Sequence, residues 1–141
     1  LISAITFSFA SSNVPLISNP DAFIWPPPEY NVAITESNTE VVMIADIVCL
    51  AVKPQYYEEV LREIKDALWE HKILVSIAPG KTLAWMEEQI GKPAKIIRTM
   101  PNTPALVKEG MMGVCANKNV GKDELELVCK LFHSFSKTEI A

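Results

Sequence analysis

A short apolar run that stops at a lysine and a proline is the feature that most constrains the fold of this chain. The run covers residues 47–52, and Lys53-Pro54 follows it directly. Proline has no amide hydrogen for a sheet, but its fixed φ angle suits the first turn of a helix. Apolar side chains then recur at helical spacing, at Tyr57, Leu61, Ile64 and Leu68. The sequence therefore predicts a buried strand that passes into a helix with one apolar face.

The same alternation of strand and helix continues toward the end of the sequence. Thr82 can cap a helix in which Leu83, Met86 and Ile90 share one face. The other elements expected here are strands at residues 73–77, 95–100 and 111–116 and a last helix at residues 125–132. Strands joined by helices of this length form a mostly parallel sheet with helices on both faces, so we expect an α/β fold.

The first 28 residues differ from the rest, because they hold five of the ten prolines and show no sustained periodicity. We expect an atypical, poorly ordered N-terminal segment at 1–28, with one strand near 14–17, and a regular domain at 29–141. That domain begins with a strand candidate at 31–35. The spacing of Ser37 and Glu40 then matches a capping box, which predicts a short helix through Ala45.

The charge balance gives no reason to expect a polyanionic partner. The formal net charge is -4, so neither nucleic acid nor an anionic membrane surface is favoured. Pro15 and Pro20 interrupt the first apolar segment, and no Lys or Arg precedes Lys53, so neither a membrane span nor a secretory signal fits. The three cysteines are widely spaced, which disfavours a disulfide framework or a zinc site. We expect a cytoplasmic protein without a metal.

Three loops follow predicted strands and should meet at one sheet edge: AVKPQ, IAPGKT and TMPNTPA. In open parallel sheets, ligands bind outside the carboxyl ends of the strands. Prolines on both sides stiffen Asn102 and Thr103, which suits residues aimed at a ligand, but a stiff turn without a ligand explains them equally well. Lys53 also has two explanations, a contact with a ligand or none, because a lysine at a strand end is most often simply solvated.

The usual phosphate-binding glycine motifs are absent. A G-x-G-x-x-G loop should follow the first strand of a dinucleotide fold, yet the first glycine in this sequence is Gly80. Gly80-Lys81-Thr82 imitates the end of a P-loop, but the first glycine of that motif would fall at Val75. We therefore reject a P-loop. No spacing of His, Cys, Ser or acidic residues indicates a catalytic triad.

Five segments carry a family resemblance: ITESNTEVV, ADIVCLAVKPQ, LVSIAPGKTL, IIRTMPNTPALVKEGM and LFHSFSKTEI. In order and spacing they resemble the cofactor domain of pyrroline-5-carboxylate reductase, over residues 29–141. Members of this family reduce pyrroline-5-carboxylate to proline with NADPH or NADH, the last step of proline biosynthesis. The resemblance implies a Rossmann-like dinucleotide-binding domain and an oxidoreductase that uses NADP, or NAD, on a small-molecule substrate.

The resemblance also assigns site residues to this sequence. The cofactor-binding residues it implies are Asn38, Ala51, Val52, Lys53, Pro54, Ile77, Ala78 and Pro79. It places Asn102 and Thr103 beside the nicotinamide or the substrate. Hydride transfer to an iminium carbon requires alignment and exclusion of water rather than a metal or a protein nucleophile, so no catalytic residue is assigned.

Two departures from the family pattern bear on activity. Residues 1–28 contain no glycine, so the first βαβ unit of the fold is expected to be incomplete; only LISNP resembles the end of its second strand. The helical C-terminal domain, through which family members form homo-oligomers, would begin after Ile140. We therefore expect this chain alone to be inactive. The alternative is a non-catalytic Rossmann-like remnant that acts at most as a nucleotide-binding or interaction module. The spacing of AVKPQ and MPNTPALV disfavours a β-hydroxyacid-type or prephenate-type dehydrogenase domain.

Overall fold

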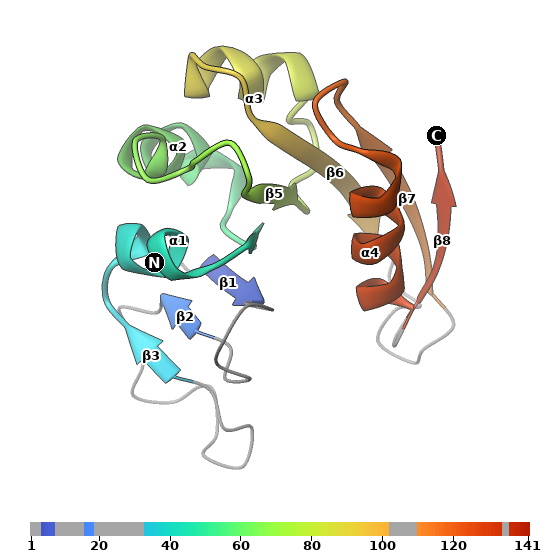
Figure 1. The fold of residues 1–141 in the computed structure, drawn as a ribbon, viewed down its shortest axis with the longest axis horizontal. Coiled ribbons are helices and arrows are strands. Elements are labelled where there is room, and N and C mark those ends of the chain that lie inside the picture. Colours follow the sequence, from blue (N-terminus) through green and yellow to red (C-terminus); the bar gives the residue numbers. More distant parts are fainter. Residues whose placement is uncertain (1–3, 8–15, 19–32, 102–109, 134–135) are drawn as a thin grey trace.

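The computed structural model describes residues 4–7, 16–18, 33–101, 110–133 and 136–141, which form a single eight-stranded sheet with helices (Figure 1). The strands are β1 (Ala4–Phe7), β2 (Leu16–Ser18), β3 (Ala33–Thr35), β4 (Ile47–Leu50), β5 (Ile73–Ser76), β6 (Lys95–Pro101), β7 (Gly110–Ala116) and β8 (Ser136–Ile140). The helices are α1 (Asn38–Ile44), α2 (Tyr57–Ile64), α3 (Leu83–Ile90) and α4 (Lys122–Phe132), with a 3-10 turn η2 at Pro54–Tyr56. Within the described ranges, none of these helices has the length and apolar character that a membrane crossing requires.

Five of the strands run in the same direction. β2 and β3 pair in parallel, as do β4, β5 and β6, and β1 lies antiparallel between these two groups. β7 is antiparallel to β6, and β8 is parallel to β7. The order β3-β2-β1-β4-β5-β6 is the strand order of a Rossmann domain. The predicted α/β fold with a mostly parallel, Rossmann-like sheet is therefore confirmed.

The direction of β1 shows how the first βαβ unit is incomplete. Ala4 pairs with Leu50 of β4 and with Ser18 of β2, the last residues of those two strands. β1 therefore begins at the edge where its neighbours end, whereas in a complete unit the first strand ends there and continues into the glycine loop. The sequence predicted no strand at residues 4–7. β2 overlaps the strand expected near 14–17, and the division of the chain after residue 28 stays a prediction.

Two apolar clusters lie on opposite faces of the sheet, because successive side chains in a strand point to opposite sides. Val48 and Leu50 of β4 belong to a cluster that also contains residues of α1, α2 and α3. Ile47 belongs to the other cluster, where Val128 and Phe132 of α4 pack. Figure 1 shows α4 across the sheet from the other three helices. The prediction of helices on both faces is confirmed.

The helix starts follow the sequence closely. The Ser37 hydroxyl accepts a hydrogen bond from the Glu40 amide (3.2 Å), and the Thr82 hydroxyl accepts one from the Trp85 amide (3.1 Å), so both hydroxyl caps form. The predicted capping box is incomplete, because the Ser37 amide donates to the Thr35 hydroxyl (3.2 Å) and the Glu40 carboxylate accepts from Thr35 instead. The prediction that the strand passes directly into an α-helix at Lys53-Pro54 is wrong in one detail. The turn η2 comes first, closed by a hydrogen bond from the Tyr56 amide to the Lys53 carbonyl (2.9 Å).

The predicted strands and helices also differ from the structure in extent. β4 and β5 end at Leu50 and Ser76, short of the predicted limits, because the chain turns toward the loops that follow. Leu68 packs in the core from a turn after α2 has ended. β8 was not predicted, since its polar sequence SKTEI resembles neither a buried strand nor a helix face.

Candidate functional site

The carboxyl ends of β4, β5 and β6 lie side by side at one edge of the sheet. Leu50 pairs with Ser76, and Ser76 pairs with Arg98, so the segments that begin at Ala51 and Ile77 leave the sheet as neighbours. The third predicted loop follows β6, but Asn102 and Thr103 lie outside the described residues. The structure therefore brings together two of the three loops on which the sequence-based prediction rests.

The loop after β4 offers its backbone and one charged side chain. Val52 is buried in the core, whereas Ala51 and Pro54 are half-buried and Lys53 is exposed. Lys53 has an extended backbone, with φ -63° and ψ 144°, and precedes the turn η2. Because the Val52 side chain is used in packing, only its backbone is available to a ligand. Lys53 is the one residue of this loop that can direct a positive charge toward a phosphate or carboxylate.

The loop after β5 is held by its own strand end. Ala78 is buried, and its amide lies 3.4 Å from the Ser76 hydroxyl, which accepts a hydrogen bond from it. Ile77 is half-buried and Pro79 is exposed. Gly80 then has a φ angle of 77°, a left-handed conformation that favours glycine. As with Val52, the Ala78 side chain faces the core, so a ligand at this edge would meet the backbone of Ala78 and the side chains of its neighbours.

A buried polar network lies directly beneath these two loops. The Tyr57 hydroxyl donates to the Leu50 carbonyl (2.8 Å) and lies 3.0 Å from the Ser76 hydroxyl. The Thr99 hydroxyl donates to the Ser76 carbonyl (3.1 Å). Burial raises the pKa of Tyr57, against an opposing effect of its hydrogen bond to Ser76, so the phenol remains a neutral donor. The network ties the ends of β4 and β5 to each other and to Thr99 of β6, directly beneath the points where both loops begin.

The sequence did not indicate this network. Tyr57 was assigned to an apolar helix face, and no motif pointed to Ser76 or Thr99. The ring of Tyr57 does pack in the core as predicted, and only the tertiary structure shows that its hydroxyl reaches two strand ends.

Asn38 lies at the first position of α1 and is 4% exposed. Its Nδ2 atom donates to Oε2 of Glu63 on α2 (2.9 Å), whereas its Oδ1 atom is buried and has no hydrogen-bond partner. A buried acceptor without a partner costs about 1–3 kcal/mol. A ligand hydroxyl that donates to Oδ1 would remove this cost. As an acceptor, Oδ1 can pair only with a ligand group that donates, such as a hydroxyl.

Asn38 and the Lys53 turn lie toward opposite ends of α2. Glu63 is six positions after Tyr57, which corresponds to roughly 9 Å along a helix. A ligand that touches both Asn38 and Lys53 must therefore be extended, as a dinucleotide is. No sequence motif singles out Glu63, which has the pattern of an ordinary exposed residue of an amphipathic helix.

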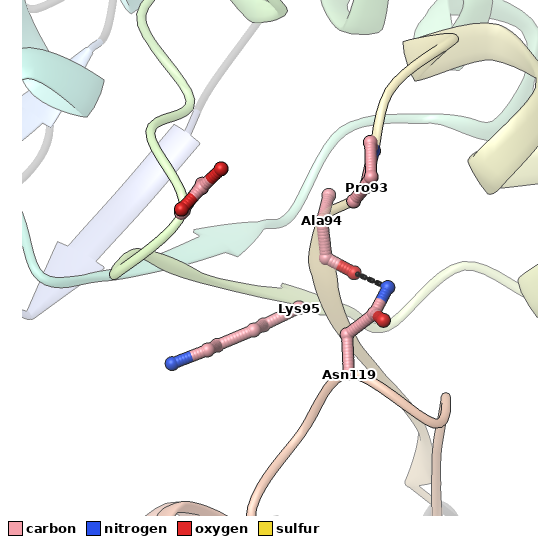
Figure 2. Close-up of a pocket in the computed structure, with 5 residues that line it drawn as sticks. Pro93, Ala94, Lys95 and Asn119 are labelled. Carbon is pink, nitrogen blue, oxygen red and sulfur yellow. Dashed lines mark hydrogen bonds between the residues drawn. The ribbon is translucent and has the colours of Figure 1, made fainter.

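A pocket of about 180 Å³ lies elsewhere, lined by Glu70, Pro93, Ala94, Lys95 and Asn119 (Figure 2). Lys95 is the first residue of β6, so this pocket is at the amino edge of the parallel strands, opposite the two loops. The Asn119 side chain donates a hydrogen bond to the Ala94 carbonyl (2.9 Å). The Lys95 side chain points away from Asn119 (Figure 2). Ligand pockets usually measure about 300–1,000 Å³, so this one is too small for a dinucleotide. Among the residues that the structure describes, no cluster of His, Cys, Asp or Glu could hold a metal.

Comparison with known proteins defines first a class and then a family. Residues 13–80 match the family model described as "NADP oxidoreductase coenzyme F420-dependent". Over these residues the chain is thus similar to a class of nucleotide-dependent oxidoreductases. It is also 41% identical over 112 residues to the pyrroline-5-carboxylate reductase of Escherichia coli strain K12, and the match covers 79% of this chain and 42% of that protein. The predicted resemblance is therefore confirmed: over the matched region the chain is similar to the pyrroline-5-carboxylate reductases.

Two solved structures of that family have the same fold over the matched region. Plasmodium falciparum pyrroline carboxylate reductase with NADP bound has a TM-score of 0.73 at 37% identity, and the match covers 79% of this chain and 42% of that chain. A pyrroline-5-carboxylate reductase from Coxiella burnetii has a TM-score of 0.76 at 34% identity, with 80% and 42% covered. The chain thus spans less than half the length of these relatives.

Proposed function

We propose that this chain forms the cofactor-binding part of a reductase that converts pyrroline-5-carboxylate to proline with NADPH or NADH. One observation carries the proposal: the segments after β4 and β5, which include Ala51–Pro54 and Ile77–Pro79, leave the sheet as neighbours at its carboxyl edge. Dinucleotides bind at that edge in this class of fold. The segments belong to a chain that is similar to pyrroline-5-carboxylate reductases, and the solved Plasmodium falciparum structure has NADP bound.

The reduction is a hydride transfer, in which the cofactor supplies the hydride to the imine carbon and the ring nitrogen takes up a proton. In this proposal the exposed Lys53 contacts an anionic part of the cofactor, and the backbones of Val52 and Ala78 form the wall behind it. Asn38 accepts a hydrogen bond from a ribose hydroxyl. Asn102 and Thr103 contact the nicotinamide side or the substrate. Each group positions a reactant and excludes water; none acts as a nucleophile.

The direction of β1 favours a second candidate, a Rossmann-like remnant without catalysis. Because β1 begins at the carboxyl edge, the described residues provide no turn from its end into a phosphate-binding helix there. A chain without that turn could keep the fold and lose the affinity for the cofactor. The two candidates differ in one measurable property, the dissociation constant for NADPH.

Isothermal titration of the 141-residue chain with NADPH and NADH tests the proposal. We expect a dissociation constant in the micromolar range, or about -8 kcal/mol of binding free energy. Lys53→Ala should weaken binding several-fold through loss of one charged contact, whereas the matched control Lys92→Ala, an exposed lysine after α3, should not. Absence of binding by the unmodified chain would favour the remnant.

An assay of pyrroline-5-carboxylate reduction separates binding from turnover. We expect none by this chain alone, since it spans 42% of its Escherichia coli relative. Turnover by the chain would contradict that expectation while supporting the family activity.

We further propose a cytoplasmic location and a homo-oligomeric assembly of the complete enzyme, supported by the family resemblance. We also propose that residues 29–141 form the dinucleotide-binding domain and residues 1–28 an atypical segment. Limited proteolysis that cleaves first before residue 29 would support this division, and first cleavage inside 33–101 would contradict it.

A further inference from the structure

We infer that Glu63 is a positioning residue for the cofactor, acting through Asn38. Its carboxylate holds the Asn38 amide in the orientation that offers Oδ1, an acceptor, to a ribose hydroxyl. This inference rests on the proposed function and extends it to a residue that no motif indicates.

The hydrogen bond between these residues determines the orientation of the amide. An ionised carboxylate accepts hydrogen bonds and cannot donate them, so the amide nitrogen of Asn38 must be the end that faces Glu63. The distance from Nδ2 to Oε2 is 2.9 Å, within the range of a charge-assisted bond. Without the carboxylate, either end of the amide could face α2. With it, Oδ1 always faces away from Glu63.

The chemistry of Oδ1 then selects the group that binds it. An amide oxygen is an acceptor, so it pairs with an O–H or N–H donor and repels an ionised phosphate oxygen. In a dinucleotide the available donors of this kind include the ribose hydroxyls. Because Oδ1 is buried and unpaired, binding would replace an unsatisfied acceptor with a hydrogen bond. Asn38 therefore acts as a hydroxyl acceptor rather than as a phosphate contact.

Burial differs between the two residues in a way that suits this division of roles. Asn38 is 4% exposed, whereas Glu63 lies on the exposed side of α2. The carboxylate thus belongs to an exposed residue while it accepts a hydrogen bond from a buried amide.

The test measures NADH affinity by calorimetry for four variants of the full chain: Glu63→Ala, Asn38→Ala, the double variant, and Glu59→Gln as an exposed acidic control on the same helix. We expect Glu63→Ala to weaken binding about three- to tenfold, in line with one hydrogen bond. The double variant should bind no more weakly than Asn38→Ala, because Glu63 acts through Asn38. Glu59→Gln should bind as the unmodified chain does.

A second arm identifies the group that Oδ1 accepts from. NADH analogues that each lack one ribose hydroxyl are titrated against the unmodified chain and Glu63→Ala. For one analogue the effect of Glu63→Ala should disappear, an outcome that a purely structural role of Glu63 would not produce. Circular dichroism melts confirm that each variant is folded under the titration conditions.

The outcomes separate this inference from the proposed function. If the unmodified chain binds no cofactor, the proposed function fails and this inference fails with it. If the unmodified chain binds but Glu63→Ala binds equally well, only the role of Glu63 is wrong. Multiplicative losses in the double variant, or equal effects with every analogue, would also overturn it.

Discussion

The hydroxyl groups of Tyr57 and Ser76 lie 3.0 Å apart, in the buried layer beneath the two loops of the proposed cofactor site. Tyr57 is the first residue of α2, and Ser76 is the last residue of β5. The Tyr57 hydroxyl also donates to the last carbonyl of β4, at Leu50. One phenol therefore connects the ends of two parallel strands, so the spacing of the loops depends on a side chain inside the core.

Removal of the Tyr57 hydroxyl should cost stability. Tyr57→Phe keeps the packed ring but leaves the Leu50 carbonyl without this donor, so the free energy of unfolding should fall by about 1–3 kcal/mol. Urea denaturation measures the change. Tyr56→Phe, at a half-buried position one residue earlier, is the matched control and should stay within about 0.5 kcal/mol. Equal stability of Tyr57→Phe and the unmodified chain would show that the network contributes nothing.

A buried lysine caps the end of α1. Lys72 is 2% exposed and donates to the carbonyls of Met43 (3.1 Å) and Ala45 (2.6 Å), which no longer have helical partners. Lys72→Met should lower the free energy of unfolding by about 1–3 kcal/mol, because both carbonyls lose their donor. Thermal or urea unfolding checks this, with the exposed Lys92→Met as control. A more stable Lys72→Met variant would mean that burial of the ammonium, which lowers its pKa, costs more than the two bonds return.

The ion pair between Lys95 and Glu124 should give the stability a dependence on acid pH. The hydrogen bond from Lys95, at 2.5 Å, holds the pKa of Glu124 below its usual value. A carboxyl group with a lowered pKa in the folded state stabilises above its unfolded value, and this stabilisation is lost as pH falls through the folded value. Glu124→Gln should therefore cost about 0.5–1 kcal/mol at pH 7.

Measurements at acid pH provide the control for the Glu124→Gln experiment. The difference between Glu124→Gln and the unmodified chain should shrink as pH falls below about 4, when the unmodified Glu124 also takes up a proton. Urea unfolding at a series of pH values measures this. A difference that is constant from pH 7 to pH 3 would contradict an ionic origin.

Gly91 ends α3 in a left-handed conformation, with φ 71°. An alanine there has open space around its Cβ, with the nearest atom 4.0 Å away, but its backbone is strained, so Gly91→Ala should destabilise by about 1 kcal/mol. Gly113→Ala is the matched control, because Gly113 lies in β7 with open space and without a left-handed φ. Differential scanning calorimetry of both variants checks the prediction; equal melting temperatures would refute the strain.

The local parts of the fold were predictable because their causes lie within a few residues. The hydroxyls of Ser37 and Thr82 accept hydrogen bonds from amides three positions ahead, and Pro54 suits the start of a helical turn. Each of these helix starts can therefore be predicted from neighbouring residues in the sequence. The apolar runs at 47–52 and 73–77 predicted the central strands for the same reason. Their parallel pairing follows from the helices that connect them, and the loops of the site follow from the pairing.

The remaining features depend on residues far apart in the sequence. No local pattern distinguishes a β1 that runs with β4 from one that runs against it, because side chains alternate equally in both. No local pattern predicts the contacts of Lys72 either, because it donates hydrogen bonds to carbonyls 27 and 29 positions earlier in the sequence.

The sequence by itself determined the order of strands and helices from β3 to α4, the sheet edge where the loops gather and the family that those loops resemble, since these depend on periodicity, caps and short motifs. Only the tertiary structure decided which side chains serve that edge. Packing turned Val52 and Ala78 inward, brought the Tyr57 hydroxyl to two strand ends and set Glu63 against Asn38. The physical reason is that a hydrogen bond between distant residues forms where the folded chain brings donor and acceptor within about 3 Å, and no spacing along the sequence encodes that distance.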